Sequence, residues 1–136
     1  MSVRPLQAGD EPAVRSLQGL LEYADPELVT AAIDGPFIGR VAVDSGNVVG
    51  YAIAFPGSET VLSELAVAPA HRRAGHGEAL VEAIAAATDT DALVVTTPAD
   101  NEAARRFYEA LGFEREERVE QFYADGTDAL RLVRRE

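Results

Sequence analysis

The chain is 136 residues long, 47% hydrophobic and 26% charged, and it carries a formal net charge of -11. This length and composition exclude a disordered chain and predict one folded domain, over residues 1–136, with its own hydrophobic core. The acidic balance disfavours binding to nucleic acid, and no apolar run reaches the roughly 20 residues of a membrane-spanning helix.

The absence of Cys and the small number of His residues exclude several kinds of active site. The chain has no Cys, which excludes disulfides, thiolate-bound zinc and a thiol nucleophile. Its two His residues are too few for a His-rich metal site, so the sequence predicts no metal dependence. The N-terminus has no signal-peptide character, and we expect a cytoplasmic protein. All 12 basic residues are Arg. Such a composition fits either adaptation to a high-salt cytoplasm or an ordinary acidic protein that favours Arg.

The first half of the chain predicts a strand, two helices and three strands. Asp10 is a plausible helix cap, and Asp25-Pro26 repeats that signal for a second helix. The Asp44-Ser45-Gly46-Asn47 segment indicates a hairpin turn. In chain order the expected elements are strand 3–5, helix 10–21, helix 25–33, strand 37–43, strand 48–55 and strand 61–68.

The second half predicts helix 77–87, strand 92–97, helix 102–111 and a hairpin over 113–134 that turns at Asp125-Gly126. The order is thus β-α-α-β-β-β-α-β-α-β-β, which is typical of an α/β fold. We expect a mixed sheet of about six or seven strands flanked by about four helices. The strands at 61–68 and 92–97 are joined through a helix, so they should run parallel as a right-handed crossover unit.

A basic, glycine-bearing turn between strand 61–68 and helix 77–87 is the main candidate site. A helix N-terminus offers unpaired N–H groups and the positive end of the helix dipole, which together favour an anion. A Walker loop is excluded because the chain has no Lys. The dinucleotide fingerprint fails because its third small position falls on Leu80. A plain helix start with solvated Arg side chains remains open from the local pattern.

The segment Val67-x-Pro69-x-x-Arg72-Arg73-x-Gly75-x-Gly77 resembles the acyl-CoA-binding signature of the GNAT superfamily of N-acetyltransferases. The resemblance implies acetyl-CoA as co-substrate and a GNAT-like fold. It also implies that the turn binds the CoA pyrophosphate through Arg72, Arg73, Ala74, Gly75, His76, Gly77 and Glu78. His76 departs from the family pattern, which is apolar there. We expect it to be a solvated loop residue, and His71 to lie on the surface.

A second motif, Asn101-x-x-Ala104-x-x-x-Tyr108-x-x-x-Gly112-Phe113, is similar to a later motif of the same family. By itself it also fits a capped amphipathic helix, but a buried Tyr hydroxyl needs a partner. The resemblance implies that Asn101 contacts the cofactor and that Tyr108 protonates the departing thiolate. A phenol in direct contact can donate to a thiolate of comparable pKa.

Without Cys, direct attack of the amine within a ternary complex is the expected mechanism. By resemblance, the backbone of Leu65, Ala66 and Val67 binds pantetheine and the thioester oxygen. Glu64 is the best-placed carboxylate for a general base, although a solvated strand carboxylate explains it equally well.

The C-terminal hairpin gives the main indication of which amine acceptor the protein uses. Residues 121–130 resemble a segment of protein N-terminal acetyltransferases, especially the ribosomal-protein alanine group. The resemblance makes Tyr123 a candidate for lining the acceptor groove, although an ordinary strand aromatic explains it equally well. Tyr23, between the first two helices, is a second candidate. That group carries a Glu on its fifth strand, and the matching position here is Thr96.

Three functions therefore remain in view. The first is acetylation of a protein N-terminal amine, the second is acetylation of a small amine, and the third is a non-catalytic CoA-binding module. Tyr108 argues against the third, because CoA binding alone needs no acid. We expect a monomer or homodimer with no nucleic-acid or membrane partner.

Overall fold

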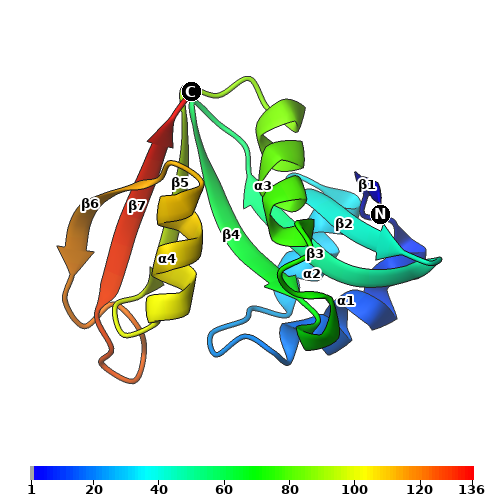
Figure 1. The fold of residues 1–136 in the computed structure, drawn as a ribbon, viewed down its shortest axis with the longest axis horizontal. Helices are drawn as coiled ribbons and strands as arrows, with labels where there is room; N and C mark the ends of the chain where they lie inside the picture. The colour runs from blue at the N-terminus through cyan, green and yellow to red at the C-terminus, as the bar shows by residue number, and fades with distance from the viewer. Residues whose placement is uncertain (1) are drawn as a thin grey trace.

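The computed structural model describes residues 2–136 and shows a seven-stranded mixed sheet with two helices on each face (Figure 1). The strands are β1 (Ser2–Pro5), β2 (Ile38–Asp44), β3 (Asn47–Phe55), β4 (Glu59–Val67), β5 (Ala92–Pro98), β6 (Glu114–Val119) and β7 (Ala129–Arg135). The helices are α1 (Glu11–Gln18), α2 (Glu27–Asp34), α3 (His76–Ala87) and α4 (Glu102–Ala110), with 3₁₀ turns η1 (Ala8–Asp10) and η2 (Pro69–His71). The predicted fold class and element order are confirmed.

The sheet runs in the order β1-β2-β3-β4-β5-β7-β6. Within residues 2–136, β4 and β5 form the one parallel pair, and α3 connects them, so the predicted parallel pairing through a helix is confirmed. All other neighbours are antiparallel. The β2–β3 hairpin turns through Ser45 and Gly46, both with positive φ, as the sequence predicts.

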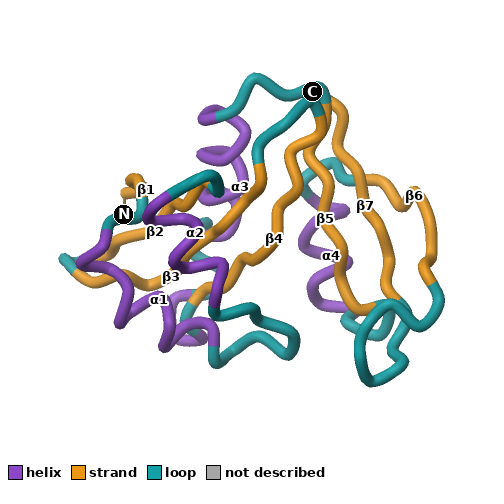
Figure 2. The backbone as a smooth tube through the Cα atoms, turned by 180° about the vertical axis from the view of Figure 1, so that it is seen from behind, coloured by secondary structure: helices purple, strands orange, loops and turns teal. Residues whose placement is uncertain are grey.

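Each face of the sheet has its own hydrophobic core. One core lies under α3 and α4 and includes Leu80, Ile84 and Tyr108, while the other lies under α1 and α2 and includes Val14 and Val29. Figure 2 shows α1 and α2 on the face opposite to α3 and α4. The β3 strand serves both cores, because Ala52 and Ala54 face α3 whereas Tyr51 and Ile53 face α1.

Several predicted boundaries differ from the structure. The first helix ends at Gln18 rather than Leu21, because Gly19 and Leu20 tighten into turns that bond Ser16 and Leu17. Asp10 stands at the cap position, but its carboxylate accepts from Arg4 and from the Gln7 N–H instead of the helix. Asp25-Pro26 does precede α2, with Pro26 at the cap.

The final hairpin also differs, because residues 120–128 separate β6 from β7 instead of a tight turn. Gly126 does form a turn there, donating its N–H to the Tyr123 carbonyl, but this turn lies inside the longer loop. Within residues 2–136, no helix has the length and apolar character needed to cross a membrane.

Candidate active site

The sheet splits open between β4 and β5. Their parallel pairing covers only residues 59–62 against 92–95, and it stops at the Leu62–Val95 pair. The register of β4 against β3 shifts here, with Ser63 as the extra residue of a bulge. A bulge bends its strand and increases its twist, so β4 turns away from β5 (Figure 1). The β4 edge from Ser63 to Val67 therefore has no strand partner on its β5 side.

The turn that leads into α3 lies beyond the end of this open edge. It runs from η2 through Arg73 and Gly75, which have φ values of 62° and 87°. No side chain caps α3, and the first backbone bond of its ladder runs from Ala79 N–H to the Gly75 carbonyl. The N–H groups of residues 76–78 are thus available to an anion at the positive end of a 12-residue helix.

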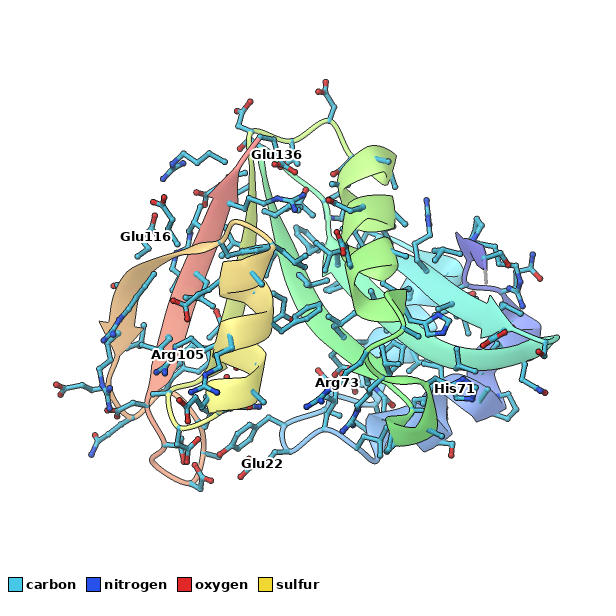
Figure 3. The ribbon with its side chains drawn as sticks, in the orientation of Figure 1. Glu22, His71, Arg73, Arg105, Glu116 and Glu136 are labelled. Carbon is cyan, nitrogen blue, oxygen red and sulfur yellow. The ribbon has the colours of Figure 1, made fainter. Side chains whose placement is uncertain are left out.

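Two exposed Arg side chains add charge to this turn. Eight of the 12 Arg residues form ion pairs within residues 2–136, and Arg72 and Arg73 are among the four that do not. Arg72 donates through Nε to the Val67 carbonyl at 3.0 Å, which ties the turn to the end of β4. Figure 3 shows Arg73 in the turn before α3, on the side toward α4. In a chain of net charge -11, two neighbouring unpaired cations favour an anionic ligand.

Close packing holds α3 against α4. A Cβ on Gly77 would lie 3.0 Å from the Phe107 ring, so any larger residue here would require that ring to shift. Asn101 caps α4 by accepting from the Ala104 N–H at 3.1 Å. This bond occupies its side-chain oxygen, while its amide group remains free to donate. Glu78 is exposed in the first turn of α3 and adds its backbone N–H to the anion-binding group.

Tyr108 lies on α4 with only 7% of its surface exposed, between the rings of Phe107 and Phe113. Its hydroxyl makes no hydrogen bond to the described residues, yet it is not among their fully buried unpaired atoms, so it reaches solvent. Burial raises the pKa of Tyr108, which keeps the hydroxyl protonated at neutral pH. It is therefore free to donate a proton to a ligand.

Glu64 is buried rather than solvated, which corrects one of the two interpretations of the sequence. Only 6% of the residue is exposed, on the α1–α2 face of the sheet. Its carboxylate accepts from Gln18 Nε2, the Tyr51 hydroxyl and the Asp25 N–H, at 2.9, 2.8 and 2.7 Å. Burial and the neighbouring Glu64 charge raise the pKa of Tyr51, so the phenol stays a donor. Glu64 thereby ties the last residue of α1 and the end of the α1–α2 loop to β4.

Tyr23 and Tyr123 come together although 100 residues separate them. Their rings stack with centroids 3.9 Å apart and planes 13° apart. The Tyr23 hydroxyl donates to Asp125 at 2.7 Å, and this bond raises the pKa of Tyr23 and lowers that of Asp125. Burial raises the pKa of Tyr123 to about 12. The α1–α2 loop and the β6–β7 loop thus form one aromatic wall.

His76 is not a solvated loop residue. It is the first residue of α3, it is only 2% exposed, and it faces Asp44 together with His71. His71 is partly exposed, in keeping with the prediction of a surface position. The buried position of His76 is where the family pattern has an apolar residue, so the imidazole fills space that an apolar side chain otherwise occupies.

Sequence reasoning missed the partners of these residues. Glu64 accepts hydrogen bonds from Gln18, Tyr51 and Asp25, which lie up to 46 residues away in the chain. The sequence indicated such partners only through polar residues, such as Gln18, within an otherwise apolar helix or strand face. No carboxylate lies on β5, where Thr96 is half-buried and pairs with Arg131 of β7.

Comparisons with known proteins agree with this geometry. Residues 36–115 match the model of the acetyltransferase (GNAT) domain family. Mycothiol acetyltransferase of Clavibacter sepedonicus is 30% identical over 92% of this chain and 46% of its own length. Human N-alpha-acetyltransferase 30 is 43% identical over 52% of this chain and 20% of its own length. The chain thus spans half or less of the length of these curated relatives.

Solved structures show the same fold. The ribosomal-protein-S18-alanine N-acetyltransferase of Escherichia coli has a TM-score of 0.84 at 23% identity, covering 98% of this chain and 92% of its own. Arabidopsis thaliana NAA60, solved in complex with acetyl-CoA, has a TM-score of 0.83 at 18% identity, covering 97% and 96%. Because the family model matches more than half of its length, this chain belongs to the GNAT acetyltransferase family.

Proposed function

We propose that this chain transfers the acetyl group of acetyl-CoA to a primary amine by direct attack, and that the amine is a protein N-terminus. The observation that carries the proposal is the unpaired β4 edge. It leads into the turn before α3, and its Leu65 and Val67 belong to the same hydrophobic core as the protonated Tyr108 on α4. An elongated ligand with a phosphate end and a thioester end fits these groups in that order. The solved structure of NAA60 with acetyl-CoA supports this choice of ligand.

Each part of the site then has one task. The N–H groups at the start of α3, with Arg72 and Arg73, hold the pyrophosphate. The open backbone of Leu65, Ala66 and Val67 bonds the pantetheine amides and polarises the thioester carbonyl. As the amine nitrogen bonds to the carbonyl carbon and the carbon–sulfur bond breaks, Tyr108 donates its proton to the sulfur.

The amine must lose a proton in the same reaction. Glu64 is the buried carboxylate on the splayed strand, and we assign it as the proton acceptor, directly or through water. A peptide α-amine has a pKa of about 8, so little assistance is needed to make it neutral. A Lys side chain, with a pKa of about 10.4, needs far more.

The aromatic wall of Tyr23 and Tyr123 supports a peptide acceptor. It joins the α1–α2 loop to the β6–β7 loop, and both loops lie at the lower side of the molecule in Figure 1, where we expect a peptide chain to approach. The similarity to human N-alpha-acetyltransferase 30 supports the same choice. Mycothiol acetyltransferase, which aligns over far more of the chain, supports a small-molecule amine as the second candidate.

Thiol release from acetyl-CoA tests both candidates. The acceptors are peptides that begin with Ala or Ser, the same peptides with a blocked α-amine, and a panel of small amines. We expect turnover with the free peptides and none with the blocked ones. Turnover with small amines alone would support the second candidate. Tight CoA binding without turnover on any acceptor would show a non-catalytic module.

A further inference from the structure

Two His residues and one Asp from separate segments meet behind the α3 turn. Asp44 ends β2, His71 ends η2, and His76 begins α3. His71 Nδ1 lies 3.6 Å from Asp44 Oδ2, and His76 Nε2 lies 3.9 Å from the same oxygen. All three donor atoms lie within 4.8 Å of one another. Figure 3 shows His71 on the side of the turn that faces the β2–β3 hairpin, away from Arg73.

The fold makes no use of the polarity of His76. Neither ring nitrogen has a hydrogen bond within residues 2–136, and Nδ1 is the one side-chain polar atom there that is both fully buried and unpaired. Buried polar groups in proteins are nearly always hydrogen-bonded. An apolar side chain of similar size would fill this place without losing any bond. The ring directs its other nitrogen, Nε2, to within 3.9 Å of Asp44 Oδ2, on the side where Asp44 and His71 are partly exposed.

We propose that Asp44, His71 and His76 bind a single Zn²⁺ or a similar first-row divalent ion. Two imidazole nitrogens and one carboxylate oxygen form a donor set typical of zinc. Zinc bonds of about 2.0–2.1 Å place two tetrahedral ligands about 3.3 Å apart. The 3.6 and 3.9 Å separations from Asp44 Oδ2 need a small contraction, and the two His nitrogens, which lie within 4.8 Å of each other, can need a larger one. The half-exposed side chains of Asp44 and His71 can supply that movement. Their exposure also leaves the fourth position open to water.

The ion would join the two ends of one loop. His71 and His76 bracket residues 72–75, which are all exposed and include Arg73 and Gly75 at positive φ. Asp44 would in turn fix that loop to the β2–β3 hairpin. The metal site therefore predicts a loop that is more ordered when the ion is present.

Zinc binding is measured first, by competition with a chromophoric chelator in excess Mg²⁺. Mg²⁺ prefers oxygen ligands and occupies sites made of carboxylates alone. We expect one Zn²⁺ per chain. His71→Gln and Asp44→Asn should each weaken binding more than the 10–100-fold that loss of an outer-shell partner costs. Asp89→Asn, at an exposed position away from the cluster, is the charge-matched control and should bind like the wild type. No saturable 1:1 binding, or equal affinity in the cluster variants, would overturn the proposal.

His76→Leu tests the buried ligand, because an apolar side chain of similar size preserves the packing. We expect this variant to keep its circular dichroism spectrum and to lose zinc binding. A folded His76→Leu protein with wild-type zinc affinity would contradict the proposed site.

Trypsin then reports on the loop, since it cleaves after Arg72 and Arg73. Zn²⁺ should slow cleavage at these two positions in the wild type but not in His71→Gln, with cleavage after Arg115 as the internal reference. Equal cleavage with and without Zn²⁺ would exclude the tie between the loop ends. None of these measurements contains acetyl-CoA, so their failure is distinct from failure of the proposed function.

Discussion

Three buried polar side chains, Tyr108, Glu64 and His76, owe their chemistry to very different surroundings. Tyr108 has rings around it and a hydroxyl without a protein partner. Glu64 has three donors and acts only as an acceptor, as an ionised carboxylate does. The ring of His76 has no hydrogen bond within the described residues, and its Nδ1 is fully buried. The Tyr108 hydroxyl and His76 Nε2 are therefore free to contact a ligand. The Glu64 carboxylate already has hydrogen-bond partners within the fold, so it also has a structural role.

Replacing Tyr108 by Phe removes only the hydroxyl. Because the proposed role of this group is proton donation to sulfur, we expect kcat to fall by roughly 10²-fold while acetyl-CoA affinity stays unchanged. Steady-state kinetics and a direct binding measurement separate the two effects. Unchanged kcat in a folded variant would show that another group protonates the thiolate.

Arg73→Gln tests the anion-binding turn. A hydrogen bond to a charged group contributes about 1.5–3 kcal/mol, so the Kd for acetyl-CoA should rise about tenfold or more. Arg115→Gln is the matched control, because Arg115 also lacks an ion pair but lies on β6. Affinity should also become less sensitive to salt in Arg73→Gln alone. Equal losses in both variants would indicate a general charge effect.

The sequence predicted the residues of both motifs but not the contacts around Glu64 and His76. Motif residues are fixed by local backbone needs, such as the positive φ of Gly75 and the close approach at Gly77. The burial of Glu64 depends instead on a register shift in β4, and that of His76 on how α3 meets the β2–β3 hairpin. Neither arrangement leaves a pattern in the local sequence.

At the level of elements, short irregularities determine where the site lies. The Ser63 bulge moves Glu64 to the α1–α2 face, while Leu62 and Leu65 pack against the α3 core. The predicted strand there was correct to within two residues, but the bulge could not be predicted, because nothing in the local sequence marks an extra residue. The start of α1 shows the same limit, since Asp10 bonds a strand residue, Arg4, rather than the helix.

The bond between Arg4 and Asp10 makes a pH-dependent contribution to the free energy of unfolding. Hydrogen bonds from Arg4 lower the pKa of Asp10, so the ionised carboxylate stabilises the folded state. This contribution is present above the unfolded pKa of about 3.9 and is lost as pH falls through the lowered folded value. Asp10→Asn should therefore unfold at lower urea concentration than the wild type at pH 7, with the difference shrinking near pH 3. Asp89→Asn should show no such difference at either pH. A gap of equal size at both pH values would mean that the charge of Asp10 is not involved.

At the scale of the whole molecule, element order and pairing followed from the sequence because hydrophobic periodicity and turn residues agree along the chain. Some of the acidic residues lie at one edge of the sheet. The outer strand β6 carries Glu114, Glu116 and Glu117 on an exposed edge, and charges there oppose pairing with another chain. Loop conformations could not be predicted from the sequence. The nine residues 120–128, for example, are held by residues far away in the chain, such as Tyr23.

The excess of acidic residues should make stability depend on salt. With 23 acidic and 12 basic residues, repulsion in the folded state is screened as ionic strength rises, so the melting temperature should increase from low to molar KCl. Sucrose is the control, because it stabilises by exclusion without screening charge. A flat curve in KCl would support the ordinary acidic protein over adaptation to high salt.

The break between β4 and β5 should make the stability of the sheet depend on the bound ligand. In the part of the chain that the structure describes, the strand pairing of β4 with β5 stops at the Leu62–Val95 pair. We therefore expect a ligand bound along the free part of β4 to act as an additional, removable strand. Ligand binding should then raise the melting temperature by mass action and slow amide exchange at Ser63–Val67 more than at the outer β6–β7 pair. Hydrogen exchange with and without CoA measures this, and uniform protection across the sheet would contradict it. The loaded enzyme would thus be more cooperative in unfolding than the free one, because the cosubstrate itself completes the sheet.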